Sequence, residues 1–583
     1  MISPQVTVLK LGGAVLRSEE DLPRAVHEIY SHWRNGEQVL VVVSAFAGTT
    51  DALLAKARTF GDTGSKATAS LLLTGETTSA AMLAMALHRS GIPSKLLTPA
   101  QVGIRTTGED PLNTEPINAN FTRLRAELES AVVIVSGFAG LDAEGDVTLL
   151  GRGGTDYTAL FLAHGLEGHC ILLKDVDGLY DLDPAVAGLG ARRFAEASYQ
   201  TALRVGGELV QSKAVEFARR RRYSFEIAAI GDDVSTLIGN LDDRFADSLS
   251  SQSKRLRVAL LGCGTVGFGV YERLMALPEA FEITGVVNLH PERAIERGVC
   301  PDLIRSDAQA LIEEDCDVVV ELIGGIQPAD ELIEHALQLD RHVITANKAL
   351  LSTRERDLQL AARDSGVSIR YSAAVGGALP ALEVANQFKT SRPRVLKGVI
   401  NGTCNFICDQ LASGIDLQSA VRQAQIEGFA EADPLLDLDG TDAAQKLILL
   451  ARAAFGVELT LTEIDRVGVT ELTPEIVRTA REKGLVHRIV AECRMTAEGL
   501  RTSVRPTQVP FSDPLAKTRG ADNCLVIENE FGHTRIFRGG GAGRYATAEA
   551  VMADLFDLRR SLRETEVAPT MQRAAAFSIG AAI

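Results

Sequence analysis

Short apolar segments alternate with amphipathic segments along most of the chain. Between residues 1 and 240, strand-like stretches such as QVLVVVSA and AVVIVSGFAG are separated by helical patterns such as SAAMLAMALHRSG. The same alternation returns from residue 256 to residue 372. Strands that alternate with helices predict a mostly parallel sheet with helices on both faces. The pattern therefore predicts the α/β class for both regions.

A polar, serine-rich segment at 241–254 separates the two regions, and we interpret it as a linker. Residues 373–540 mix helical and strand-like patterns, which predicts an α+β domain. A chain of 583 residues has room for three or four domains of about 100–200 residues each. We therefore expect domains at 1–240, 255–372 and 373–540.

Composition and charge narrow the classes of partner. The formal net charge of −16 disfavours nonspecific binding to nucleic acids and to acidic membranes. No apolar run approaches the roughly 18–20 residues that cross a bilayer, and the first residues lack the pattern of a signal peptide. Eight scattered cysteines without a CxxC pair are typical of reduced thiols. We expect a cytoplasmic enzyme that acts on small molecules, with neither nucleic acid nor membrane as a partner.

The glycine pattern GCGTVG follows an apolar strand and precedes a helical segment. Glycines at such a turn allow a pyrophosphate to approach the backbone, and the helix N-terminus adds partial positive charge. A glycine turn without function is the alternative, but the strand, turn and helix context favours a dinucleotide site in a Rossmann domain. The residues expected there are Gly262, Gly264, Thr265, Val266 and Gly267.

The next strand ends without the carboxylate that binds the ribose of NAD in many dinucleotide sites. Asn288 stands near that place, and Arg293 follows it. A missing carboxylate removes repulsion of a 2′-phosphate, and an arginine can pair with one. This favours NADP over NAD as the cofactor.

Carboxylates crowd a turn in EGFAEADPLLDLDGTDAAQKL, and Lys446 follows Asp442 by one helical turn. One interpretation is a solvated acidic loop in which Asp442 caps a helix. The other is a site that holds a substrate ammonium beside a lysine that serves a carbonyl oxygen. Spacing alone does not decide between them.

Seven motifs occur in the order found in homoserine dehydrogenases: GCGTVG, ELIGG, TANKALL, VGGALP, NGTCNFI, EGFAEADPLLDLDGTDAAQKL and RGGGAGRYATAEAVMADL. Together they span residues 256–560, so this part of the chain resembles that family. The resemblance implies reversible hydride transfer between NAD(P)H and aspartate 4-semialdehyde, which gives homoserine for threonine and methionine biosynthesis. A different NAD(P) oxidoreductase on the same fold is the rival hypothesis.

The resemblance also implies roles for residues at matching positions. Lys348 and Lys446 match the catalytic lysines. The implied substrate-binding residues are Glu431, Asp437, Asp442, Asn401 and Thr403, and the further cofactor-binding residues are Gly324, Lys348, Gly541 and Ala542. The segment 541–583 is expected to complete the Rossmann domain. The family usually has an acidic cation ligand where this chain has Ser372, so a sodium site would rest on the backbone at Val375 and Gly377.

Residues 1–240 resemble aspartokinases of the amino acid kinase family, which implies a three-layer α/β/α domain that uses ATP and Mg²⁺. The matching motifs are KLGG, VVSAFAGTTDALL, TGETTSAAML, SGFAG, LGRGGTDYTA and KDVDGLYDLDP. An arginine can hold a substrate carboxylate, and a lysine beside glycines can offset phosphoryl charge. By these roles Arg152 would hold the carboxylate, Glu76 or Asp156 the ammonium, Lys10 with Gly12 and Gly13 the phosphate, and Asp175 and Tyr180 the nucleoside. Ser44 would either cap the following helix or touch substrate.

Two departures bear on phosphate binding. Ala14 and Val15 stand where aspartokinases have hydroxyl residues, and Glu208 stands where they have a lysine. Lys174, at a position where threonine is usual, or Lys213 could supply a compensating cation. Three hypotheses follow: a homoserine dehydrogenase with a kinase-like domain, a fully bifunctional enzyme, or a dehydrogenase fused to a noncatalytic ligand-binding or assembly module.

The resemblance also bears on assembly and regulation. Both families pair through sheets, so a homodimer or a larger homo-oligomer is expected. The linker is too short for the ACT regulatory domain that usually follows an aspartokinase, and so is the segment after residue 560. We therefore expect no feedback regulation through such a module.

Overall fold

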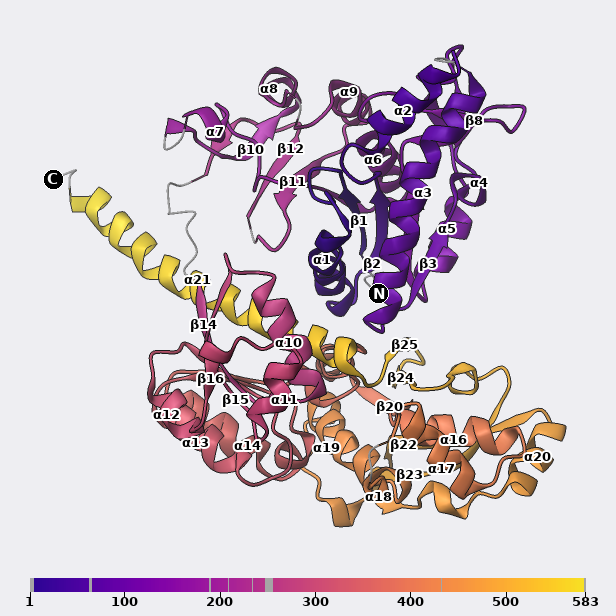
Figure 1. Cartoon of the computed structure of the whole chain (residues 1–583), viewed down its shortest axis with the longest axis vertical. Helices are drawn as coiled ribbons and strands as arrows, with labels where there is room; N and C mark the ends of the chain where they lie inside the picture. The colour runs from indigo at the N-terminus through magenta and orange to yellow at the C-terminus, as the bar shows by residue number, and fades with distance from the viewer. Residues whose placement is uncertain are drawn as a thin grey trace. The chain divides into compact units, whose positions relative to one another are not determined.

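The most apolar segments of the N-terminal part, Val6–Leu11 (β1), Gln38–Val43 (β2) and Val132–Ser136 (β6), are neighbouring parallel strands. The computed structural model in which they are seen describes residues 5–61, 65–187, 190–207, 209–232, 234–246, 255–430 and 433–580. Its chain divides into two compact units, Met1–Arg89 with Pro93–Ser251 and Ser90–Ile92 with Gln252–Ile583 (Figure 1). The predicted linker lies largely outside the described residues.

The first unit is built on one sheet with the strand order β13-β10-β12-β11-β9-β1-β2-β6-β3. Its remaining strands are β3 (Ser94–Leu97), β9 (His169–Lys174), β10 (Phe194–Ser198), β11 (Phe225–Ala229), β12 (Ser235–Gly239) and β13 (Arg244–Phe245). The pairs β11–β12 and β10–β13 are antiparallel and the other pairs are parallel, so the predicted mostly parallel sheet is confirmed with a mixed edge. A small second sheet has the order β5-β4-β7-β8, with β4 (Arg105–Thr107), β5 (Glu115–Asn118), β7 (Ala139–Leu141) and β8 (Val147–Leu149).

Successive residues of the central strands are buried although their side chains point to alternating faces of the large sheet. Both faces are therefore covered, and helices cover them. The helices are α1 (Leu22–Arg34), α2 (Thr49–Thr59), α3 (Lys66–Arg89), α4 (Pro99–Val102), α5 (Phe121–Leu128), α6 (Gly154–Leu166), α7 (Pro184–Ala187), α8 (Tyr199–Val205) and α9 (Ser212–Arg221). By length and composition α3 could cross a membrane. In this fold, however, Leu72, Leu83 and Leu87 are buried and α3 contacts β3 and β6, as a core helix does.

The second unit begins with a parallel sheet in the order β16-β15-β14-β17-β18-β19. Its strands are β14 (Leu256–Leu261), β15 (Phe281–Val287), β16 (Ile304–Arg305), β17 (Val318–Glu321), β18 (His342–Thr345) and β19 (Ile369–Arg370). The helices between them are α10 (Thr265–Met275), α11 (Pro291–Glu296), α12 (Ala308–Glu313), α13 (Ala329–Gln338) and α14 (Lys348–Asp364). The last helix, α21 (Arg544–Gly580), returns to this region, where Val551 and Leu555 share a core with Val258 and Leu260.

A mostly antiparallel sheet in the order β21-β23-β22-β20-β24-β25 completes the second unit. Its strands are β20 (Pro393–Val399), β21 (Asp465–Arg466), β22 (Leu485–Thr496), β23 (Gly499–Pro510), β24 (Asp522–Asn529) and β25 (Thr534–Gly540). The helices are α15 (Ala381–Phe388), α16 (Gly402–Ala412), α17 (Leu417–Ile426), α18 (Leu435–Leu438), α19 (Thr441–Phe455) and α20 (Pro474–Glu482). One core holds Leu350 and Leu358 of α14 together with Leu447 and Leu450 of α19. This packing joins the parallel sheet to the α+β region.

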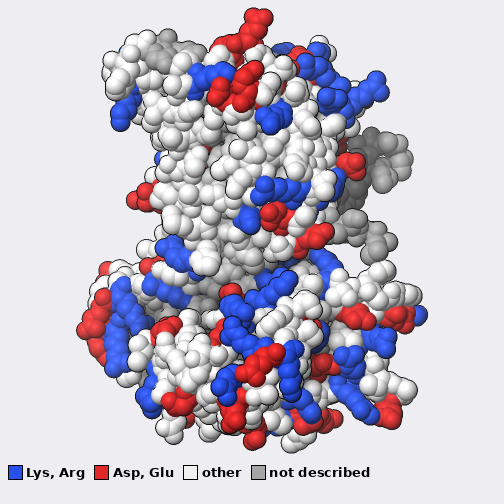
Figure 2. Space-filling view, turned by 90° about the vertical axis from the view of Figure 1, so that its right-hand side faces the viewer, with Lys and Arg blue, Asp and Glu red and all other residues white. Residues whose placement is uncertain are grey.

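Acidic and basic side chains are interspersed on the face shown in Figure 2. Mixed charges of this kind leave no extended field of one sign on that face.

Candidate functional site

The first cluster is centred on Asp442, in the first turn of α19. The N-cap of this helix is Gly440 in a left-handed conformation (φ +83°), which rules out the interpretation in which Asp442 caps the helix. Asp442 is 7% exposed, which also excludes a solvated position. One turn later, Lys446 Nζ donates to Asp442 Oδ2 (2.7 Å) and to the carbonyl oxygen of Ile400 (2.9 Å).

A second lysine reaches the same carboxylate from a different helix. Lys348 opens α14, and its Nζ lies 3.2 Å from Asp442 Oδ1. Burial opposes ionisation of Asp442, but Lys446 and Lys348 hold its pKa at about 2. The lysine side chains differ in access, since 36% of Lys348 and 12% of Lys446 is exposed. Asp442 is therefore an ionised carboxylate that positions two ammonium groups.

Asn401 joins this cluster to a second carboxylate. Its Nδ2 donates to Asp437 Oδ1 (2.6 Å) and to Asp442 Oδ2 (2.8 Å). Its Oδ1 accepts from Cys404 N and so caps α16. Burial, and then the charge of Asp442, raise the pKa of Asp437. Thr403 Oγ1 contacts the same carboxyl and donates to Phe429 O (2.6 Å). Of the predicted substrate-binding residues, Glu431 lies outside the described residues.

The predicted dinucleotide turn has the geometry that its glycines suggest. Gly262 has φ +96°, and a Cβ at Gly267 would collide with the carbonyl oxygen of Gly262. A Cβ at Gly264 would meet nothing within 4 Å. The backbone at Gly264 is therefore open to an approaching ligand, whereas Gly267 is required by packing. Thr265 and Val266 form the first turn of α10.

Asn288, at the end of the next strand, holds this turn in place. Its Oδ1 accepts from Cys263 N (3.1 Å) and its Nδ2 donates to His290 O (2.8 Å). Arg293 is exposed on α11. The described residues at this strand end therefore present an amide and an arginine.

Sequence reasoning missed one residue, Glu321, which ends β17 and is fully buried. Its Oε1 accepts from Ile323 N (2.7 Å) and Gly324 N (3.2 Å), and its Oε2 accepts from Thr345 Oγ1 (2.6 Å). Gly324 has φ +79° and open space around its missing Cβ. The ELIGG motif could have indicated this residue, because its glutamate ends a strand immediately before a glycine turn.

The loop of the VGGALP motif lies against the loop of the RGGGAGRY motif. Ala378 N donates to Gly540 O (3.0 Å), and a Cβ at Gly377 would lie 2.8 Å from the same oxygen. Gly541 packs against Asn523, and Ala542 is exposed.

Close to the predicted sodium site, Ser372 N and Oγ both donate to Asp554, at 2.9 and 2.7 Å. Val375 is fully buried. The described residues contain no group of three or more His, Cys, Asp or Glu side chains arranged to hold a metal.

In the first unit, two lysines share the carboxylate of Asp156. Lys10 Nζ lies 2.7 Å from Asp156 Oδ1, and Lys174 Nζ lies 3.0 Å from Oδ2. All three residues are less than a tenth exposed. Burial opposes ionisation of Asp156, but the two ammonium groups lower its pKa. Burial and the neighbouring Lys10 lower the pKa of Lys174 to about 8.

Glu76 lies close by on α3 and is 3% exposed. Burial raises its pKa to about 7, and its Oε2 has no hydrogen-bond partner within the described part of the chain. The amide of Ala45 bonds the same carboxyl, and the carbonyl of Ala45 lies beside Gly13. The glycine loop and Glu76 therefore meet around Ala45.

The remaining residues predicted for this site differ in their contacts and exposure. Gly48 is the N-cap of α2, which rules out the alternative in which Ser44 caps that helix. The Ser44 carbonyl accepts from Ser79 Oγ (2.6 Å). Arg152 and Asp175 are exposed. Tyr180 donates its hydroxyl to Asp177 (2.7 Å). Glu208 lies outside the described residues.

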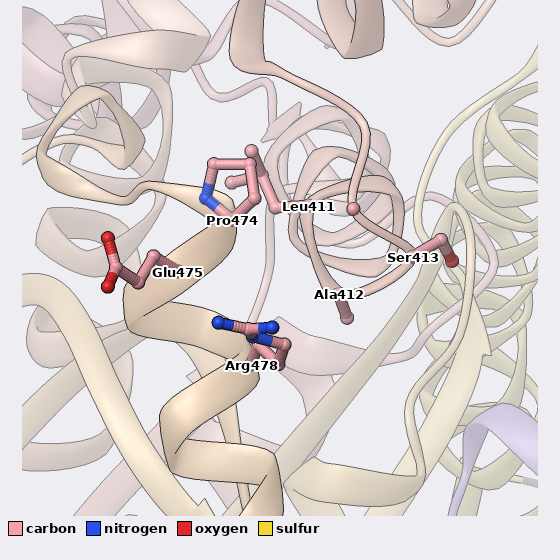
Figure 3. A pocket seen from close by; sticks show the side chains of 7 residues that line it. Leu411, Ala412, Ser413, Pro474, Glu475 and Arg478 are labelled. Carbon is pink, nitrogen blue, oxygen red and sulfur yellow. The ribbon is translucent and has the colours of Figure 1, made fainter.

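A separate hollow lies between the C-terminal end of α16 and α20 (Figure 3). It is lined by Leu411, Ala412, Ser413, Gly414, Pro474, Glu475 and Arg478. Asn401 caps the opposite end of α16, about 15 Å away at 1.5 Å per residue. The hollow is therefore not part of the Asp442 cluster.

Comparisons with known proteins match these regions. The amino acid kinase family model matches residues 5–224, the homoserine dehydrogenase NAD-binding domain matches 262–372, and the homoserine dehydrogenase model matches 380–556. Homoserine dehydrogenase of Pseudomonas aeruginosa is 33% identical over 320 residues, which cover 53% of this chain and 73% of that protein. That of Corynebacterium glutamicum is 35% identical over 321 residues, covering 52% and 72%.

A solved structure gives the same result. The crystal structure of a homoserine dehydrogenase from Thiobacillus denitrificans is similar with a TM-score of 0.51 and 33% identity, and it covers 53% of this chain and 74% of that one. The chain therefore belongs to the homoserine dehydrogenase family, with an amino acid kinase domain fused ahead of its NAD-binding and catalytic domains.

Proposed function

We propose that the Asp442 cluster is where this homoserine dehydrogenase interconverts aspartate 4-semialdehyde and homoserine. The observation that carries the proposal is the pair of ammonium groups, Lys348 and Lys446, held by one buried carboxylate. Preorganised cations beside a reacting carbonyl stabilise the oxyanion that forms when hydride adds to it. The cluster lies where α14 packs on α19, at the junction of the NAD-binding and catalytic domains.

Lys446 is assigned as the proton donor to the substrate oxygen. Two of its three N–H donors are engaged, by Asp442 and by the carbonyl of Ile400, and these contacts direct the ammonium. A bound nicotinamide supplies the hydride. Lys446 gives its proton to the resulting alkoxide and takes it back in the reverse reaction, while Lys348 adds a second positive charge.

The substrate ammonium is assigned to Asp437 and Glu431. Asp442 is already shared by two lysines and by Asn401. Asp437 accepts only one of the two bonds from Asn401 Nδ2 and has a raised pKa. A cationic group beside it would favour its ionised form. Binding of the ammonium would therefore replace the missing counter-charge.

The preferred cofactor is NADP. The observation that supports it is the amide of Asn288, in place of a carboxylate, beside exposed Arg293. Arg293→Ala is expected to raise the KM for NADP with little effect on that for NAD. An equal change for both cofactors would overturn this assignment.

A sodium ion is proposed to bind the backbone at Val375 and Gly377. Exchange of Na⁺ for choline at constant ionic strength tests this site. A homodimer or larger oligomer is likewise proposed, and light scattering of the purified chain tests it.

Replacement of Lys446 tests the main assignment. Lys446→Ala is expected to lower kcat for homoserine oxidation by on the order of 10²–10⁴ while NADP binding, followed by fluorescence, stays close to wild type. Lys517→Ala, at an exposed lysine of the same domain, is the matched control. Loss of NADP binding in the Lys446 variant would contradict the role in proton transfer.

Aspartate recognition by the kinase domain is a second proposed function. The supporting observation is the buried Oε2 of Glu76, which lacks a hydrogen-bond partner within the part of the chain that the structure describes and is suited to a substrate ammonium. Hydroxamate trapping with ATP and aspartate separates the hypotheses. Hydroxamate would establish the bifunctional enzyme, and aspartate binding without hydroxamate would establish a noncatalytic module.

A further inference from the structure

Two buried ammonium groups meet on one carboxylate at the carboxyl ends of two central strands of the kinase-domain sheet. Lys10 lies near the end of β1, and Lys174 is the last residue of the adjacent parallel strand β9. We infer that Lys174 is the second cation of an anion site, built with Lys10 and Asp156, that takes the phosphate groups of a nucleoside polyphosphate. The inference rests on the proposed ligand-binding function of this domain.

The charge balance of the cluster is the first argument. Two ammonium groups and one carboxylate leave one net positive charge among residues that are each less than a tenth exposed. Buried charge is costly unless it is paired. An anionic ligand would supply the missing negative charge, and it would also keep Lys174 protonated despite its lowered pKa.

The position of the cluster is the second argument. Ligands of open α/β sheets bind beyond the carboxyl ends of the parallel strands, and both lysines lie at such ends. Gly12 is the first residue after β1, and a Cβ at Gly12 would collide with Lys10 Nζ. The missing side chain lets the loop backbone lie against the ammonium group, as in loops that enclose phosphate.

The other candidate cation is already committed to the protein. Lys213 Nζ donates to Asn113 Oδ1 (2.9 Å), Thr114 O (2.8 Å) and Leu150 O (3.0 Å). An ammonium group has three donors, so these bonds use all of them. Lys213 therefore holds the loop before Gly151, and the role of second cation falls to Lys174.

The same geometry divides the work of the two acidic residues. Both oxygens of Asp156 face lysines, so this carboxylate is an internal counter-ion. Glu76 Oε2 has no hydrogen-bond partner among the described residues, so an amino group could bind there. Phosphate and ammonium would then be bound by separate parts of one site.

Calorimetric titration of the full chain tests the inference. Tripolyphosphate, inorganic phosphate and MgATP are titrated separately in the presence of saturating NADP, which occupies the pyrophosphate site of the dehydrogenase. The variants are Lys174→Met, Lys174→Arg and the control Lys95→Met, an exposed lysine on β3. Thermal unfolding and homoserine oxidation verify that each variant is folded.

Wild type and Lys95→Met are expected to bind tripolyphosphate and MgATP. Lys174→Met should weaken both by about tenfold or more, and Lys174→Arg should restore most of the affinity. Binding of tripolyphosphate without MgATP would overturn the nucleotide assignment. Unchanged affinity in a folded Lys174→Met variant, or no polyphosphate binding by wild type, would overturn the site itself. Hydroxamate formation by the wild type is scored separately, so loss of turnover and loss of the anion site are distinguishable.

Discussion

The hydroxyl of Thr345 donates a 2.6 Å hydrogen bond to the fully buried carboxylate of Glu321. This bond joins the carboxyl ends of β17 and β18, and each partner holds a further loop. Glu321 accepts from Gly324 N, while Thr345 Oγ1 accepts from Asn347 N (3.0 Å). Asn347 then caps α14, whose first residue is Lys348. The pair therefore links the predicted cofactor loop to a lysine of the Asp442 cluster.

Thr345→Val is expected to lower kcat/KM for homoserine by about tenfold, equal to roughly 1.4 kcal/mol, because the start of α14 loses its anchor. We expect kcat to fall more than the KM for homoserine rises, since Lys348 is moved rather than removed. Steady-state kinetics at several NADP concentrations measure the two constants. Thr345→Ser, which keeps the hydroxyl, should restore them. Wild-type kinetics in Thr345→Val would contradict the positioning role.

Local patterns predict part of this site well. The i, i+4 spacing of Asp442 and Lys446 places both on one helix face, and the structure brings their charged groups within 2.7 Å. Lys348 reaches Asp442 only because α14 packs on α19, and Asn401 reaches it from the start of α16. Such contacts depend on tertiary packing, and in the sequence only the family motifs pointed to these residues.

Helix starts decide two alternatives that the sequence left open. Ser44 and Asp442 each stand before or within the start of a helix and have side chains suited to capping. In both cases a glycine with positive φ, Gly48 or Gly440, occupies the N-cap instead. Glu321 was missed for a different reason: its burial depends on hydrogen bonds to two backbone amides and a threonine, which a strand pattern does not reveal.

Asn401→Ser should separate two roles of one side chain. Serine still caps α16, but it is too short to bridge Asp437 and Asp442. Asp437 already has a raised pKa, and loss of the amide donor raises it further. Since ionised Asp437 is proposed to hold the ammonium, kcat/KM for homoserine should fall at low pH and its acid limb should move to higher pH. The pH profile measures this, with exposed Asn386→Ser as the control. An unshifted limb would exclude Asp437 as the ammonium ligand.

A histidine on α1 is expected to make the kinase domain sensitive to alkaline pH. His32 lies between Glu37 (2.9 Å) and Glu28 (3.7 Å), and these carboxylates outweigh burial and raise its pKa from 6.5 to about 9. The raised pKa means that the folded state holds the proton more tightly. The added stability is complete below pH 6.5 and is lost as pH rises through about 9.

Calorimetric scans of the full chain at pH 6 and pH 9.5 measure this effect. His32→Gln should lower the midpoint of the kinase-domain transition at pH 6, by the equivalent of about 1–3 kcal/mol, and should remove most of the decline toward pH 9.5. His88→Gln, at an exposed position on α3, should leave both scans unchanged. If His32→Gln shows the same alkaline decline as wild type, the decline comes from groups other than His32.

Replacement of Gly264 and of Gly267 by alanine should have different effects on stability and on NADP binding. At Gly264 the backbone has an ordinary φ of −74° and a Cβ meets nothing within 4 Å, so Gly264→Ala should unfold at the wild-type temperature. The added methyl occupies the space open to a pyrophosphate, so NADP affinity should drop by about tenfold or more.

At Gly267 the methyl collides with the Gly262 carbonyl, so Gly267→Ala should lose both thermal stability and NADP binding. Fluorescence titration with NADP and thermal unfolding distinguish the variants. A destabilised Gly264→Ala, or one that binds NADP normally, would show that the cofactor phosphates do not lie against this glycine.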